Sequence, residues 1–135
     1  MGKPKFKWNE IPLTKDIDPV DINFSIKDLT LKKPFLVNIG NPHIIFFDEE
    51  IEKYDIESFG SLIENDSLFP EKINVSFAKL KSDNHIVLNV WERGAGKTNA
   101  CGTAACATAV AGVEMGLIKN KVTVTLPGGD LEIYY

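Results

Sequence analysis

The sequence has few cysteines and no long apolar run, and both absences narrow what the chain can be. Only Cys101 and Cys106 occur among its 135 residues, too few for a disulfide-rich secreted scaffold. The first ten residues, MGKPKFKWNE, contain no apolar segment typical of a signal peptide. No apolar run approaches the roughly 20 residues that a membrane span needs. We therefore expect free thiols, no membrane partner and a cytoplasmic location.

An excess of basic residues is also lacking. Lysine and arginine together number 15 against 19 acidic residues, so the formal net charge is -4. This balance provides no positive field for nucleic acid, and we expect no nucleic-acid partner. The hydrophobic share of 44% and the charged share of 25% are instead ordinary for a globular protein. At this length, they predict one domain with a substantial core.

Apolar periodicity predicts an α+β fold. Residues 1–19 carry three of the seven prolines and predict an irregular lead-in, whereas residues 20–135 predict a folded domain. Period-two alternation and turn signals predict strands and hairpins, and helical spacing predicts a first helix within 54–70. A second helix is expected over 101–117. The expected strands lie at 21–26, 29–31, 73–80 and 85–93, on both sides of Gly40-Asn41-Pro42 within 35–47, and on both sides of Pro127–Gly129 within 121–135.

The second predicted helix has an unusual composition. No charged residue occurs from Thr98 to Val113, and small residues dominate this segment. A helix that is apolar or small on every face is typically buried all round. The hairpin turns meanwhile indicate antiparallel pairing. We therefore predict a largely antiparallel sheet wrapped around a central buried helix.

Cys101 lies at the expected start of this helix, after a glycine-rich loop. The first N–H groups of a helix lack intrahelical partners and favour an anion, which includes a thiolate. Gly102 leaves space for a ligand to approach the backbone. The alternative is that each cysteine is a small buried hydrophobe, an interpretation that suits Cys106 among its alanines. A disulfide or metal clip is not expected, because five helical residues separate the two sulfurs by about 140°. The GAGKT stretch also lacks the spacing of a phosphate-binding loop.

The stretch from Trp91 to Val110, WERGAGKTNACGTAACATAV, resembles the signature of diaminopimelate epimerases. Three further stretches match in the same order: GNPH at 40–43, FPEKINVSF at 69–77 and VTLPGGDLEI at 124–133. The opening MGKPKF is similar to the segment that joins the two halves of these proteins. The resemblance covers essentially the whole chain but only the C-terminal half of a family member.

The resemblance implies cofactor-independent epimerisation of L,L- and meso-diaminopimelate, which serves lysine and peptidoglycan synthesis. One cysteine thiolate removes the α-hydrogen and a second cysteine thiol reprotonates the carbon from the other side. Two helix N-termini hold the reacting carboxylate. No cofactor or metal is expected. The implied partners are diaminopimelate, the N-terminal half with the second cysteine, and a second copy of the protein in a homodimer.

The same resemblance assigns roles by position. Cys101 matches one acid/base cysteine, and Gly102 and Thr103 match backbone donors to the reacting carboxylate. Glu92 and Arg93 match residues that bind the substrate's ammonium group and distal carboxylate. The alternative for this last pair is a solvated strand end.

Further assignments concern the distal end of the substrate. Asn41 and Asn74 match hydrogen-bonding residues there, and His43 matches a histidine near the site. Asn41 before a proline alternatively only builds the turn, and His43 is alternatively an ordinary loop histidine. Two positions depart from the family pattern: Lys97 stands where glutamate is usual, and Ala104 where glycine is usual.

The leading interpretation is the C-terminal domain of a diaminopimelate epimerase, and two alternatives to it stay open. The first is another cofactor-independent amino-acid racemase or isomerase of this fold, and the second is a non-catalytic remnant that binds a small dicarboxylate. We expect the chain alone to be inactive, because Cys106 does not point to the same side as Cys101.

Overall fold

The main feature of the computed structural model, which describes residues 3–135, is a sheet of seven strands. Its strands follow the order β3-β4-β5-β6-β8-β9, and β7 also pairs with β6. A separate two-stranded sheet is formed by β1 and β2. The strands are β1 (Asn23–Ile26), β2 (Leu29–Lys32), β3 (Phe35–Asn38), β4 (Pro42–Phe47), β5 (Asn74–Ser82), β6 (His85–Glu92), β7 (Gly96–Thr98), β8 (Lys121–Leu126) and β9 (Gly129–Tyr134).

Most strand pairs are antiparallel, and each of the two parallel pairs is connected through a helix. The pairs β4–β5 and β6–β8 are parallel, and a parallel pair needs a crossover connection. Helix α1 (Ile56–Glu64) lies in the first crossover and α2 (Gly102–Glu114) in the second. The remaining pairs are antiparallel. The predicted α+β class with a largely antiparallel sheet is therefore confirmed.

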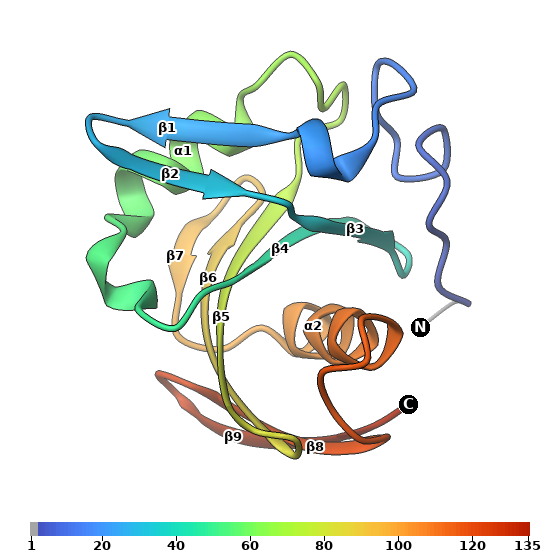
Figure 1. Ribbon diagram of the computed structural model, residues 1–135, viewed down its shortest axis with the longest axis vertical. Coiled ribbons are helices and arrows are strands. Elements are labelled where there is room, and N and C mark those ends of the chain that lie inside the picture. The colour runs from blue at the N-terminus through green and yellow to red at the C-terminus, as the bar shows by residue number, and fades with distance from the viewer. Residues whose placement is uncertain (1–2) are drawn as a thin grey trace.

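The two helices cover opposite faces of the large sheet. In Figure 1 the sheet curves around α2, with β3 on one side and β8 and β9 on the other. Helix α1 and the β1–β2 hairpin lie on the outer face. A buried hydrophobic cluster lies on each face of the sheet, and residues of β5 contribute to both. Ala78 belongs to the α2 cluster, whereas Val75 and Phe77 belong to the α1 cluster.

Helix α2 is central, as predicted, but shorter and less completely enclosed. Eight of its 13 residues are buried, whereas Cys106 and Val113 remain partly exposed. The helix ends at Glu114 because Gly116 adopts a positive φ of 73°, a common way to stop a helix. No helix within residues 3–135 is long and apolar enough to cross a membrane.

The lead-in segment packs tightly on the domain. Lys5 forms a β-bridge with Asn38, and the Asn38 side-chain amide donates to the carbonyls of Glu10 and Ile11. Ile11 is fully buried and Leu13 nearly so, both in the α1 cluster. A short 3-10 helix, η1 (Pro19–Asp21), then leads into β1, and a second, η2 (Ile51–Lys53), precedes α1.

Candidate active site

The predicted site residues meet at one end of the large sheet. Parallel pairing of β4 and β5 sets His43 beside Asn74, at the start of both strands. Strand β6 runs antiparallel to β5, so its last residue, Glu92, arrives at the same end. Helix α2 begins there as well, because the Asn41 amide contacts Thr103 in its first turn. Four segments that are far apart in sequence thus converge.

A series of hydrogen bonds leads from β4 to the Cys101 sulfur. The His43 Nε2 atom lies 3.0 Å from Asn41 Oδ1, and Asn41 Nδ2 lies 3.4 Å from Thr103 Oγ1. The Thr103 hydroxyl lies 3.5 Å from Cys101 Sγ. Because an amide oxygen only accepts, the His43 Nε2 carries the proton. Thr103 accepts from Asn41, and in the last contact either the hydroxyl or the thiol can donate. The series thus joins buried His43 to the Cys101 sulfur.

His43 is a fully buried residue of β4, which rules out an ordinary loop histidine. Burial, together with the positive charge of Arg93, lowers the pKa of His43 from 6.5 to about 4. The imidazole is therefore neutral at neutral pH. Its Nδ1 atom has no hydrogen-bond partner among residues 3–135.

Asn74 is buried and braces two loops against each other. Its Oδ1 accepts the backbone N–H of Arg93 at 2.8 Å, and its Nδ2 donates to the Pro42 carbonyl at 3.0 Å. Only one amide hydrogen of Asn74 has no such partner. The structure therefore gives Asn74 a bracing role, and its contact with a substrate stays a prediction.

Arg93 is the only arginine in the chain. Its side chain is exposed, and one guanidinium nitrogen, Nη1, donates to the Glu71 carbonyl at 3.1 Å. Glu92 is half-buried beside it. A guanidinium has five N–H donors in a planar fork that matches a carboxylate. Most of these donors remain available at this end of the sheet.

The residues around the N-terminus of α2 differ in their exposure, and there is space beside Gly102. Cys101 is the N-cap residue, with an extended φ of -152°, and the residue is 7% exposed. Gly102 is exposed, and a Cβ added there would meet nothing within 4 Å. Ala104, by contrast, is fully buried in the α2 cluster, and Lys97 projects from β7 as an exposed residue. The first N–H groups of a helix have no intrahelical partner, so those of α2 lie beside the sulfur at a point where the space next to Gly102 is open.

Comparison with known proteins identifies the family of the chain. The family model for diaminopimelate epimerase matches residues 35–135. The chain belongs to the diaminopimelate epimerase family. Diaminopimelate epimerases of Methylocella silvestris, Sphingopyxis alaskensis and Halothermothrix orenii are 49%, 48% and 48% identical over 100%, 98% and 98% of this chain. The chain covers 48%, 49% and 48% of these proteins, so it spans about half the length of the curated relatives it matches.

Solved structures support the fold of this epimerase domain. Two phenazine biosynthesis proteins of the PhzF family, from Enterococcus faecalis and Bacillus anthracis, superpose with TM-scores of 0.53 and 0.51. They are 20% and 21% identical, and the matches cover 71% and 83% of this chain but only 34% and 33% of theirs. At this identity the likeness concerns the fold alone. The family resemblance predicted from the sequence is thus confirmed for fold and membership.

Cys106, the other cysteine of this chain, lies in a different environment from Cys101. Cys106 lines a cavity of about 370 Å³ together with Ile39, Val110, Tyr134 and Tyr135. Burial is the main cause that raises the pKa of the Cys106 thiol. Cys106 therefore holds less thiolate at neutral pH than an ordinary cysteine.

These surroundings predict an order of alkylation in the epimerase domain. At neutral pH a small reagent such as iodoacetamide is expected to modify Cys101 first, although Cys106 is the more exposed thiol. Cys106 labelling is expected to rise only at alkaline pH, because its raised pKa delays thiolate formation. Peptide mapping after short exposures across pH 6–10 measures both rates. Cys106→Ala serves as the control, and faster labelling of Cys106 at neutral pH would contradict the assignment.

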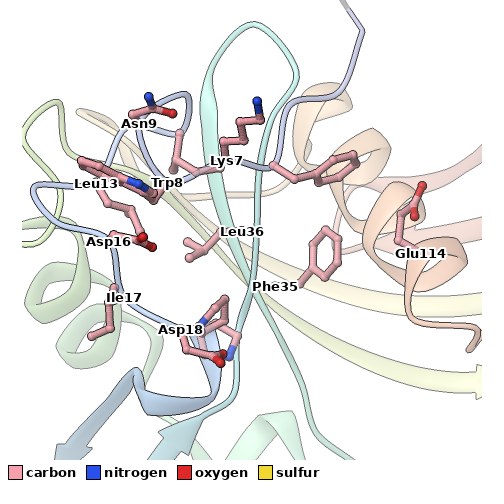
Figure 2. Close-up of a pocket in the computed structure, with 14 residues that line it drawn as sticks. Lys7, Trp8, Asn9, Leu13, Asp16, Ile17, Asp18, Phe35, Leu36 and Glu114 are labelled. Carbon is pink, nitrogen blue, oxygen red and sulfur yellow. The ribbon is translucent and has the colours of Figure 1, made fainter.

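A larger cavity of the epimerase domain lies away from these residues. It measures about 790 Å³ and is lined by residues of the lead-in segment, β3 and α2 (Figure 2). Figure 2 shows Trp8 and Leu13 on one side, Leu36 in the centre and Glu114 of α2 on the other. None of the predicted site residues lines it. No sequence signal indicated this cavity, because its wall comes from an irregular segment.

Proposed function

We propose that the chain supplies one half of the active site of a diaminopimelate epimerase, with Cys101 as one of two acid/base residues. The observation that carries this proposal is the series of hydrogen bonds that starts at buried His43 and ends on the Cys101 sulfur. The N-terminus of α2, where Cys101 is the N-cap residue, is a position that favours an anion. The names of the relatives supply the substrate class.

The proposed chemistry is proton transfer without a cofactor. In one direction the Cys101 thiolate takes the α-hydrogen of diaminopimelate, and the electron pair of the C–H bond stays on the α-carbon and its carboxylate. A thiol from the other half then donates a proton to the opposite face, so the configuration inverts. The N–H groups of Gly102 and Thr103 offset the charge that develops on the carboxylate.

We assign binding of the distal end of the substrate to the segments that converge at this end of the sheet. Arg93 binds the distal carboxylate through its planar fork, and Glu92 binds an ammonium group. Asn41 reaches the substrate by exchanging its bond to Thr103, which at 3.4 Å is long. Asn74 contributes its remaining amide hydrogen and holds Arg93 in place.

The proposed partners are diaminopimelate and a domain equivalent to the N-terminal half of the relatives. That domain brings the second thiol, because Cys106 faces the cavity beside Tyr134 and Tyr135. A homodimer of the assembled protein and a cytoplasmic location stay predictions.

Deuterium exchange tests this proposal. The 135-residue chain in deuterated water is expected to leave the α-hydrogen of L,L-diaminopimelate in place, because inversion needs an acid and a base on opposite faces. Addition of the N-terminal half of the Methylocella silvestris relative is expected to restore exchange; we call this mixture the complemented enzyme. Mass spectrometry measures incorporation, with other amino acids as controls for specificity. Exchange by the chain alone would overturn the two-cysteine account, and exchange of another amino acid in preference would overturn the substrate.

A further inference from the structure

The 92–95 turn, which carries Glu92 and Arg93, is held by a residue outside the predicted site. The turn connects β6 to β7 and closes with a bond from the Ala95 N–H to the Glu92 carbonyl. Two successive N–H groups point out of it, from Arg93 and Gly94. Asn74 accepts the first, and the carboxylate of Glu64 accepts the second at 2.8 Å.

Glu64 holds the turn at two points. Its Oε2 accepts the Gly94 N–H, and its Oε1 accepts the indole N–H of Trp91 at 2.9 Å. Trp91 precedes Glu92, and Gly94 follows Arg93. One carboxylate therefore fixes both sides of the pair that is proposed to bind substrate. Gly60, one turn earlier on α1, allows this approach, since a Cβ there would lie 2.4 to 2.8 Å from atoms of Trp91.

The location of Glu64 is not one in which a carboxyl group would be expected to stabilise the fold. Glu64 is only 8% exposed and is the last residue of α1, where the helix dipole disfavours a negative charge. Within residues 3–135, ion pairs shorter than 4.0 Å join only Lys53 to Asp48 and Lys119 to Asp83. Within the described residues, the hydrogen-bond partners of the buried Glu64 carboxyl are thus two N–H donors, from Trp91 and Gly94. A neutral glutamine has one oxygen and cannot accept at both positions.

We propose that Glu64 is a positioning residue that holds Glu92 and Arg93 in the conformation that binds substrate. This inference rests on the proposed function for its catalytic consequence. The clamp itself is a property of the chain alone. Arg93 has one backbone and one guanidinium contact to its surroundings, so loss of the clamp on Gly94 frees the turn on one side.

The experiment compares Glu64→Gln and Glu64→Asp with Ile63→Val. The first removes one acceptor oxygen, and the second keeps the carboxyl group but, with a shorter side chain, withdraws it from both donors. Ile63, the neighbouring residue of α1, is fully buried, so its truncation lowers stability without touching the turn. In the isolated chain, NMR hydrogen exchange at Gly94 and the Trp91 indole is expected to be about tenfold faster in both Glu64 variants. The single arginine gives an unambiguous Arg93 Nε–H signal, which is expected to shift in them and not in Ile63→Val.

Kinetics of the complemented enzyme give the second measurement. Both Glu64 variants are expected to raise KM about tenfold or more with a smaller change in kcat, because binding groups are misplaced. Ile63→Val is expected to keep the wild-type KM. Unchanged exchange and an unmoved Arg93 signal would overturn the clamp. Faster exchange with unchanged KM would overturn the positioning role. If the unmodified complemented enzyme does not turn over diaminopimelate, the proposed function fails, and the Arg93 signal alone decides whether Glu64 positions the turn.

Discussion

Replacement of Cys101 by serine is expected to lower α-hydrogen exchange by the complemented enzyme by about 10²–10⁴-fold, the usual contribution of a general acid or base. A serine hydroxyl ionises far less readily than a thiol, so it does not become the base at neutral pH. The neighbouring Thr103 hydroxyl and the α2 N-terminus remain in the variant, which isolates the sulfur as the cause. Initial rates of deuterium incorporation from both L,L- and meso-diaminopimelate measure the effect.

Two comparisons make the Cys101→Ser result specific. Cys106→Ser is expected to keep exchange close to that of the unmodified protein, because Cys106 faces the separate cavity beside Tyr134 and Tyr135. Substrate binding by Cys101→Ser is expected to persist, since Arg93 and the backbone donors are untouched. A Cys101→Ser variant with full exchange, or a Cys106→Ser variant that loses it, would show that the sulfur at the helix start is not the acid/base group.

The strands and turns of this domain are readable from sequence because they depend on local chemistry. Alternating apolar residues mark β5 and β6, and the Pro127–Gly129 turn separates β8 from β9 as expected. The family stretches also fix the positions of the site residues. Strand β7 was missed because Gly96, Lys97 and Thr98 carry no apolar alternation, and their pairing depends on β6 alone.

Helix lengths were harder to predict because they depend on tertiary context. The expected helix within 54–70 is reduced to α1 at Ile56–Glu64, and residues after it form turns, such as the Asp66 side chain accepting the Leu68 N–H. The predicted 101–117 helix ends three residues early because of Gly116. Side-chain oxygens and glycines at chain reversals decide these ends, and periodicity does not reveal them.

The site was predicted as a set of residues but not as a network. Sequence spacing places Asn41, Asn74 and Arg93 far apart, and only pairing of β4, β5 and β6 brings them together. The bracing bonds of Asn74 and the clamp of Glu64 therefore had no sequence signal in a single chain. A glutamate at the end of an amphipathic helix suggests a solvated residue, and its burial against Trp91 becomes visible only in three dimensions.

Gly102→Ala is expected to lower activity without lowering stability. The position is the first residue of α2, and an added methyl meets nothing within 4 Å. Alanine also restricts the unfolded chain and favours the helix by up to about 1 kcal/mol relative to glycine. The free energy of unfolding of the isolated chain, measured by urea denaturation, is therefore expected to stay equal or rise.

The same methyl group is expected to lower exchange by the complemented enzyme by about 10²–10³-fold, the effect of losing one donor to a developing oxyanion. It projects into the open space through which a carboxylate is proposed to reach the backbone N–H groups of Gly102 and Thr103. Ser61→Ala is a matched control, because this exposed residue of α1, which is not among the site residues, gains helix propensity of about 0.5 kcal/mol. A Gly102→Ala variant that is more stable and fully active would mean that no carboxylate binds at the α2 N-terminus. A less stable variant would mean instead that the space in front of Gly102 is filled in solution.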